Sequence, residues 1–239
     1  MTREGTGHFF GLLPESMAGS QLYGVELDPL TAGIAKQLYP NSSIVNSGFE
    51  DFKPPDGFFD VAVGNVPYGQ FKVNDAAYNR ENFLIHDYFF AKALDTVRPG
   101  GIVAFITSKG TLDKQNSSVR EYLARRAELV GAIRLPDNTF VANAGTRVTA
   151  DILFLKRRDF LISEKEDLPP WAVLNTDHAG IEMNDYFVEH PEMILGKMMV
   201  ESGPFGPETR CKAMEGEPLA DRLSEAIHRL PYDVFEYDF

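Results

Sequence analysis

Short apolar runs alternate with amphipathic stretches along residues 1–159. Runs of about four to eight apolar, often β-branched residues are typical of strands, whereas apolar residues that recur at helical spacing predict helices. The expected strands are residues 21–26, 43–46, 58–63, 102–107, 129–134 and 151–156. The expected helices are residues 29–38, 82–97 and 117–127. This alternation predicts an α/β fold with a mainly parallel sheet covered on both faces.

Two of these elements carry additional local signals. The helix at 29–38 follows Asp28, a good N-cap residue, and has Pro29 at its first position. The strand at 58–63 reads FFDVAV and shows no polar alternation after Asp60. That pattern is expected of a strand buried on both faces of a sheet.

The pattern changes after Arg158. Residues 160–239 contain many acids, few strand signals, a loop-like GPFGP at 203–207 and one amphipathic helix at 219–230. We therefore expect one domain over residues 1–159 and an irregular, partly helical, acidic C-terminal appendage over residues 160–239.

Charge is unevenly distributed along the chain. The formal net charge is −12, and residues 160–239 hold six Lys/Arg against seventeen Asp/Glu, which is −11. Residues 98–158 hold eleven basic and five acidic residues, a local +6. Charge informs on partners rather than on fold. Five arginines in this stretch are candidates for phosphate contacts, although charge alone favours a solvated helix face: Arg120, Arg125, Arg126, Arg134 and Arg147.

Several classes of protein are disfavoured by the sequence. No apolar run reaches bilayer length, and the N-terminus lacks the features of a signal peptide. A single cysteine, Cys211, excludes an internal disulfide and predicts a spectator thiol. The five histidines show no metal-ligand spacing, and His86 is expected to pack within an aromatic helix. These features predict a soluble cytosolic protein without a metal or a membrane partner.

Two strand-associated positions have residues that suit a nucleoside ligand. Gly5, Thr6 and Gly7 precede a helical run, and glycines there let a ligand approach backbone N–H groups, although a Gly-x-Gly taken alone favours an ordinary tight turn. Glu26 ends the next strand, where a carboxylate can accept two hydrogen bonds from a ribose diol. The alternative is that Glu26 merely precedes a helix capped by Asp28.

The most informative stretch is GNVPYG at residues 64–69, directly after FFDVAV. The amide oxygen of Asn65 and the carbonyl of Val66 are two acceptors on a turn that Pro67 stiffens. Two acceptors can hold both hydrogens of an amino group and make its nitrogen more nucleophilic, while Tyr68 offers a flat face for stacking a planar ring. The alternative is a tight Asn-Pro turn with a packed tyrosine.

The order of these motifs resembles class I S-adenosylmethionine-dependent methyltransferases, in particular the adenine-N6 DNA methyltransferases with Asn-Pro-Pro-Tyr motifs, which include type I modification subunits. More narrowly, it resembles the methylase domains of helicase–methylase proteins on bacterial mobile elements. The resemblance covers most of residues 5–158 and rests on these stretches: GTGHFFGLLPE, LYGVELD, GNVPYGQFKVND, FFAKALDTVRPGGIVAFITS and GAIRLPDNTFVANAGTRVTADILFLKR. HPEMILGKM and ESGPFGPET resemble the C-terminal segment of the narrower group.

The resemblance implies S-adenosyl-L-methionine as cofactor and DNA as partner, with a Rossmann-like sheet as fold. It implies cofactor contacts from six residues and from Asn65: Gly5, Thr6 and Gly7 at the methionine part, Glu26 at the ribose, and Phe49 or Glu50 at the adenine. Asn65, Val66, Pro67 and Tyr68 would form the catalytic turn, with Tyr68 stacked on the target base. Phe140, in LPDNTF, matches an aromatic that packs against a flipped base, and it suits a core position equally.

Three departures from the family pattern stand out. Val66 replaces the usual first proline, and SGFED at 47–51 lacks the usual Asp-Phe pair. Only four residues precede Gly5, so the sheet is expected to lack its first strand, which puts cofactor affinity in question.

A non-catalytic scaffold or a fragment of a larger mobile-element protein is therefore one alternative function. Methylation of a protein glutamine or of an RNA amino group is another. No compact target-recognition domain is evident, so sequence choice is expected from another domain or chain.

Overall fold

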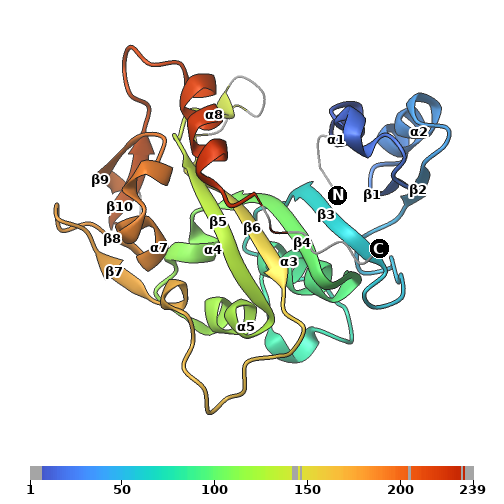
Figure 1. The fold of residues 1–239 in the computed structure, drawn as a ribbon, viewed down its shortest axis with the longest axis horizontal. Helices are drawn as coiled ribbons and strands as arrows, with labels where there is room; N and C mark the ends of the chain where they lie inside the picture. Colours follow the sequence, from blue (N-terminus) through green and yellow to red (C-terminus); the bar gives the residue numbers. More distant parts are fainter. Residues whose placement is uncertain (1–6, 142–144, 146, 204–205, 233, 235–239) are drawn as a thin grey trace.

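A four-stranded sheet forms the centre of the protein (Figure 1). The computed structural model describes residues 7–141, 145, 147–203, 206–232 and 234. The sheet has the order β3–β4–β6–β5, and its strands are β3 (Phe59–Asn65), β4 (Val97–Ser108), β6 (Ala150–Arg157) and β5 (Ala127–Leu135). Of the expected site residues, Gly5 and Thr6 lie outside the described part of the chain.

The direction of the strands determines which ends meet. β3 runs parallel to β4, whereas β6 is antiparallel to both β4 and β5. β3, β4 and β5 therefore share one direction, and their carboxyl ends lie at the same edge of the sheet as the start of β6. The expected strands are all present, and the sheet is mixed because β6 is inserted in reverse between β4 and β5.

A second, smaller sheet lies beside β3 (Figure 1). It pairs β1 (Tyr23–Glu26) in parallel with β2 (Ser43–Asn46), and it is associated with α2 (Pro29–Leu38). The expected cap of α2 is confirmed, because Asp28 Oδ1 accepts a hydrogen bond from the backbone N–H of Thr31 at 2.7 Å. Two short elements precede β1: α1 (His8–Gly11) and the 3₁₀ turn η1 (Glu15–Met17).

The strand β3 is less buried than its sequence predicts. Phe58 is 48% exposed and Val63 is 42% exposed, so the expectation of burial on both faces is wrong. The physical reason is that β3 is an outer strand of its sheet and the β1–β2 sheet does not join the ladder in the described residues. The two sheets meet instead through rings, since Tyr23 lies 5.5 Å from Phe58 and 5.3 Å from Phe59 between centroids.

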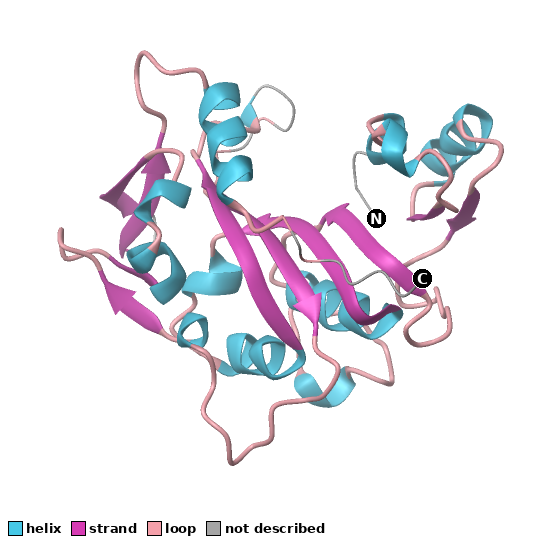
Figure 2. Cartoon of the chain, viewed as in Figure 1, coloured by secondary structure: helices cyan, strands magenta, loops and turns pink. Residues whose placement is uncertain are grey.

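Helices cover the four-stranded sheet. α3 (Ile85–Thr96) passes behind β3 and β4 in Figure 2 and is buried along almost its whole length. It begins three residues later than predicted because Asn82 has a φ of 58° and Leu84 is extended. The turn η2 (Asn79–Glu81) precedes it, and α4 (Gly110–Asp113) and α5 (Ser118–Arg126) follow β4.

The segment after residue 160 has more regular structure than its sequence predicts. It contains two antiparallel hairpins, β7 (Leu174–Thr176) with β8 (Glu182–Asn184), and β9 (Lys197–Gly203) with β10 (Gly206–Lys212). Of the loop expected at 203–207, residues 203, 206 and 207 lie in paired strands, and residues 204–205 lie outside the described residues. Its other elements are η3 (Pro170–Ala172), α7 (Asp185–Glu189), η4 (Pro191–Met193) and the predicted helix α8 (Leu219–Arg229). Trp171, Phe187 and Cys211 belong to the same core cluster as α3 and the central sheet. The division of the chain at residue 160 stays a prediction.

None of the helices in the described ranges is long and apolar enough to cross a lipid bilayer.

Candidate functional site

The residues of the GNVPYG turn lie at the edge of the sheet where β3 and β4 end. Asn65 is the last residue of β3 and pairs with Ile106 of β4. The backbone N–H of Val66 donates to the carbonyl of Ile106 at 3.0 Å, and the side chain of Val66 is buried. The start of the turn is therefore fixed to β4, and its position does not depend on loop contacts.

The turn presents two hydrogen-bond acceptors. Asn65 Oδ1 accepts a hydrogen bond from the Tyr68 hydroxyl at 3.2 Å, and an amide oxygen has a second lone pair available. The carbonyl of Val66 accepts no hydrogen bond from any described residue. Tyr68 itself is exposed. Asn65, Val66, Pro67 and Tyr68 thus lie together at the end of β3, and their catalytic role stays a prediction.

Glu26 lies at the carboxyl end of β1 and is 8% exposed. Its Oε1 accepts from the backbone N–H of Asp28 at 2.8 Å, and its other oxygen has no partner among the described residues. Asp28, not Glu26, caps α2, and the hydrogen bond from the N–H of Thr31 lowers the pKa of Asp28. One carboxylate oxygen of Glu26 is thus left for a ligand, as a ribose contact requires.

Gly7 is required by local geometry. Its φ is 81°, in the left-handed region, and a Cβ there would lie 2.6 Å from the ring of Tyr39. The carbonyl of Gly7 accepts from the N–H of Phe10 at 2.9 Å, which closes the turn into α1. The tight-turn explanation is therefore sufficient for Gly7, and its contact with a cofactor stays a prediction.

The turn that contains Phe49 and Glu50 is held by a buried lysine. Lys92 Nζ donates to the carbonyl of Phe49 at 2.6 Å and to the carbonyl of Glu50 at 3.2 Å. The ring of Phe49 is buried and packs against Phe89, with 4.8 Å between centroids. The half-buried Glu50 side chain folds over Gly48. Phe49 is therefore a core residue, and Lys92 holds the backbone carbonyls of this turn.

The same lysine also binds the loop that follows the GNVPYG turn. Its third contact is with Asp75 Oδ2 at 3.0 Å, and Asp75 also accepts from the Tyr88 hydroxyl at 2.8 Å. These contacts lower the pKa of Asp75 against the opposing effect of burial. Lys92 thus joins the turn at Phe49 and Glu50 to the loop that contains Asp75. Lys92 was not among the residues predicted from the sequence, although a lysine inside the apolar run FFAKAL is a signal of a buried charge.

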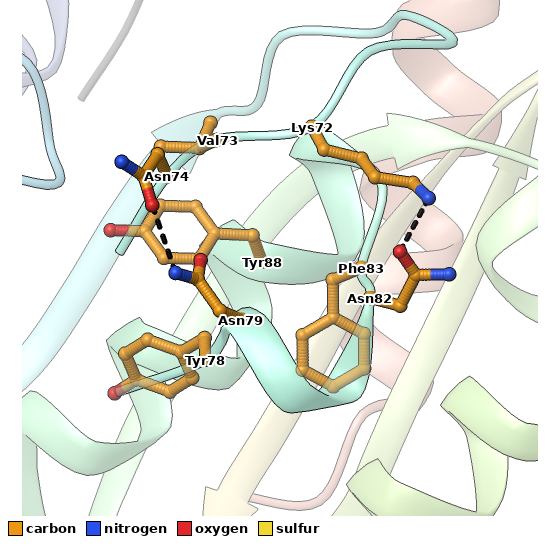
Figure 3. A pocket seen from close by; sticks show the side chains of 8 residues that line it. All are labelled: Lys72, Val73, Asn74, Tyr78, Asn79, Asn82, Phe83 and Tyr88. Atoms are coloured by element: carbon orange, nitrogen blue, oxygen red, sulfur yellow. Dashed lines mark hydrogen bonds between the residues drawn. The ribbon is translucent and has the colours of Figure 1, made fainter. Parts of the chain in front are cut away.

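The loop itself encloses a pocket of about 250 Å³ (Figure 3). Its ends are joined by a hydrogen bond from the N–H of Ile85 to the carbonyl of Phe71 at 3.0 Å. Asn79 Nδ2 donates to Asn74 Oδ1 at 2.8 Å, and Lys72 binds Asn82 at 2.5 Å. The lining consists of three amides, one lysine, one valine and three aromatic rings: Lys72, Val73, Asn74, Tyr78, Asn79, Asn82, Phe83 and Tyr88. These internal bonds hold the loop in one shape next to the turn.

Phe140 lies in the turn after β5, at the same edge of the sheet. The N–H of Thr139 donates to the carbonyl of Pro136 at 3.1 Å, which shapes this turn. Phe140 is half-buried and packs against the core cluster. The structure thus supports the core position, and a contact with a substrate base stays a prediction.

The five arginines of the basic stretch have different environments. Arg120 and Arg134 are buried, and Arg120 Nε donates to the carbonyl of Ala172 at 3.0 Å. Arg125 and Arg126 donate to backbone carbonyls nearby. Arg147, in contrast, is 62% exposed. The solvated helix face suggested by charge alone is therefore wrong for Arg120 and Arg134, which bind a buried carbonyl and buried carboxylates, whereas Arg125 and Arg126 are half-buried.

His86 packs within α3, as expected from its aromatic neighbours. It is buried beside Asp87 and Lys114, whose Nζ lies 2.9 Å from His86 Nε2. Burial lowers the pKa of His86, so the ring is neutral near pH 7. In the described residues, no group of three His, Cys, Asp or Glu side chains is arranged to hold a metal ion.

Cys211 should be unreactive in the folded protein. It is completely buried, and burial raises the pKa of its thiol from 9.0 to about 12. Because the thiolate is the nucleophile, this shift lowers the reactive fraction at pH 8 by roughly a thousandfold. We expect one thiol per chain to react with Ellman's reagent in denaturant and almost none in the native state. Rapid labelling of native protein would contradict this placement of Cys211.

Comparison with known proteins agrees with this architecture. Residues 41–140 match the model of the Eco57I restriction-modification methylase family. The chain is 32% identical over 219 residues to "Defense against restriction protein B" of Escherichia phage P1. That match covers 89% of this chain and 9% of the phage protein, so the chain spans only a small part of that relative's length.

Solved structures give the fold. The putative class I S-adenosylmethionine-dependent methyltransferase of Listeria monocytogenes aligns with a TM-score of 0.52 at 17% identity, over 68% of this chain and 54% of that one. The M protein of the type I restriction enzyme EcoKI aligns with a TM-score of 0.53 at 12% identity, over 94% of this chain and 65% of that one. The protein therefore has the fold of class I S-adenosylmethionine-dependent methyltransferases, and its residues 41–140 carry the sequence pattern of the Eco57I restriction-modification methylases.

Proposed function

We propose that this chain transfers a methyl group from S-adenosyl-L-methionine to the N6 amino group of an adenine in DNA. The observation that carries the proposal is the turn at Asn65–Tyr68, which presents an amide oxygen and a backbone carbonyl at the carboxyl edge of the sheet. Ligands of open α/β sheets bind at this edge. The match to a restriction-modification methylase family over residues 41–140 supports DNA as the substrate class.

The residues near β1 fit the cofactor. Glu26 has one carboxylate oxygen without a described partner, which suits a hydrogen bond from a ribose hydroxyl. Glu50 is better placed than the buried Phe49 to border the adenine of the cofactor. The methionine part is assigned to Gly5, Thr6 and Gly7, of which the structure describes only Gly7. When bound, the cofactor supplies a methyl group activated by its positively charged sulfur.

The turn residues orient and activate the target amino group. N6 is not accessible for in-line attack inside a duplex, so the adenine must leave the helix. Its two amino hydrogens donate to Asn65 Oδ1 and to the carbonyl of Val66. As the N–C bond forms and the C–S bond breaks, positive charge develops on nitrogen, and both hydrogen bonds strengthen. The nitrogen then loses one proton to solvent. Stacking on Tyr68 offsets part of the unstacking cost, by roughly 1–3 kcal/mol.

Calorimetric titration of S-adenosyl-L-methionine, followed by tritium transfer to DNA, tests this function. We expect binding by the wild-type chain, weakened about 10- to 100-fold in Glu26→Ala, because a hydrogen bond to a charged group contributes roughly 1.5–3 kcal/mol. Glu26→Gln retains an acceptor and should lie between the two. Tritium should enter adenine-containing duplexes and not duplexes in which N6-methyladenine replaces adenine.

Two results would contradict the proposal. One is a folded chain that binds no cofactor, which would favour a scaffold role. The other is transfer to RNA or to a protein glutamine with none to DNA.

The acidic balance of residues 160–239 leads us to assign the choice of DNA sequence to another domain or chain, since phosphate contacts need cations.

A further inference from the structure

A second hollow, of about 220 Å³, lies at the carboxyl edge of the central sheet. It is formed where β4 ends and β6 begins, and β10 closes one side. Its lining combines two hydroxyls, three cations and one acid with small residues: Ser108, Lys109, Gly110, Arg147, Val148, Thr149, Glu208 and Arg210. Nothing in the proposed methyl transfer uses these residues.

The hollow is close to the candidate catalytic turn. Asn65 pairs with Ile106, and Ser108 lies two residues further along β4. Neighbouring strands are about 4.8 Å apart and rise about 3.3 Å per residue, so the near wall of the hollow lies roughly 8 Å from Asn65. A nucleic-acid strand with one nucleotide inserted at the turn would therefore pass over or beside the hollow.

Two of the three cations in the lining are available to a ligand. Lys109 Nζ donates to Thr209 Oγ1 at 3.0 Å, and no carboxylate in the described residues lies within hydrogen-bond distance of it. Arg147 is 62% exposed, and its nearest carboxylate oxygen, on Asp137, is 3.9 Å away. Arg210, in contrast, binds Glu208 at 3.0 Å.

The acids around the hollow are already paired. Asp137 is buried and binds Lys212 Nζ at 3.0 Å, and it lies 3.8 Å from Arg210. Glu201 also binds Lys212, at 2.9 Å, and Glu208 binds Arg210. Four cations thus face three carboxylates, which leaves a surplus of one positive charge, and the two cations without a carboxylate within hydrogen-bond distance are Lys109 and Arg147. The hollow suits an anion, in a protein whose overall charge is −12.

We propose that this hollow binds a backbone phosphate of the substrate DNA, next to the nucleotide whose base enters the catalytic turn. Lys109 and Arg147 contact the phosphate oxygens, and the hydroxyl of Ser108 is an additional donor. Such a contact fixes the register of the strand at the site without reading its sequence. The proposal rests on the proposed function for its choice of DNA over other polyanions.

The salt dependence of DNA binding tests this site. Each phosphate contact with duplex DNA contributes about 0.9 to the slope of log K against log salt. We expect Arg147→Gln and Lys109→Gln each to weaken duplex binding roughly tenfold and to reduce this slope by about one, on any sequence. Lys165→Gln is the matched control, because Lys165 is exposed on the segment that follows the far end of β6. It should change neither quantity.

DNA affinity is measured without cofactor, so the result does not depend on cofactor binding or on methyl transfer. Unchanged slopes in both hollow variants, or equal changes in the control, would overturn the proposal. Inorganic phosphate provides a further arm: if Arg147→Gln loses binding of free phosphate while its DNA affinity stays at the wild-type value, the hollow is a site for free phosphate and the proposal fails. Calorimetry of S-adenosyl-L-methionine on the same variants should give wild-type values, which separates failure here from failure of the methyl-transfer function.

Discussion

Replacing Asn65 with alanine should lower the rate of methyl transfer by about 10²- to 10³-fold, the usual effect of removing one preorganised hydrogen-bonding group from a transition state. The substitution removes the acceptor Oδ1 and leaves the carbonyl of Val66, which the hydrogen bond to Ile106 keeps in place. The interaction tightens as charge develops on nitrogen, so kcat should fall while the KM for DNA changes little. Tritium transfer to duplex DNA under saturating cofactor measures this.

Two variants of the same turn serve as controls. Asn65→Asp keeps an oxygen acceptor and should retain more activity than Asn65→Ala. Tyr68→Phe keeps the ring but removes the hydroxyl that donates to Asn65 Oδ1 at 3.2 Å, so it separates stacking from this hydrogen bond. If Asn65→Ala transferred methyl groups within about threefold of the wild-type rate while remaining folded, the assignment of the turn as the catalytic centre would be wrong.

Elements with strong local signals were predicted well. The bounds of α2 and β2 agree with the sequence analysis to the residue, and the cap on Asp28 is present. β3 also ends at Asn65, the first residue of the candidate catalytic stretch. These features depend on N-capping, on proline geometry and on apolar runs, which act over a few residues and are readable without tertiary structure.

Features that depend on distant residues were not predicted. The antiparallel direction of β6 is determined by pairing with β4 and β5, and an apolar run does not encode direction. The exposure of β3 follows from its outer place in the sheet. Lys92 acts through Asp75 and the carbonyl of Phe49, which lie 17 and 43 residues away in sequence. The strands β7 and β8 have only three residues each, and β9 and β10 carry mostly exposed or half-buried residues. Their pairing and the core beneath them stabilise them.

Arg134, one of two buried arginines of the basic stretch, connects the sheet to the segment after residue 160. Arg134, in β5, binds both oxygens of Asp151 in β6 at 2.8 and 2.9 Å, and its guanidinium lies 4.1 Å from the ring of Phe187. A second carboxylate, on Asp113, is 2.9 Å away. Burial alone would lower the pKa of Arg134, but the two carboxylates outweigh it and the net shift is upward, so the group stays charged.

We therefore expect Asp151→Ala to lower the free energy of unfolding by roughly 3–5 kcal/mol, because it leaves part of a buried charge without its partner. Urea unfolding followed by circular dichroism measures this change. Asp60→Ala is the matched control: Asp60 pairs with Arg98 at 2.8 Å as well, but its side chain is 74% exposed. Solvent screens that pair, so its loss should cost under about 1 kcal/mol.

The comparison isolates burial as the cause, since both substitutions remove an aspartate that lies 2.8 Å from an arginine nitrogen. Equal losses in the two variants would mean that Arg134 finds a substitute partner, with Asp113 taking the whole charge. A double variant, Asp151→Ala with Arg134→Met, tests this directly. It should be more stable than Asp151→Ala alone, because a buried apolar side chain costs less than a partly unpaired guanidinium.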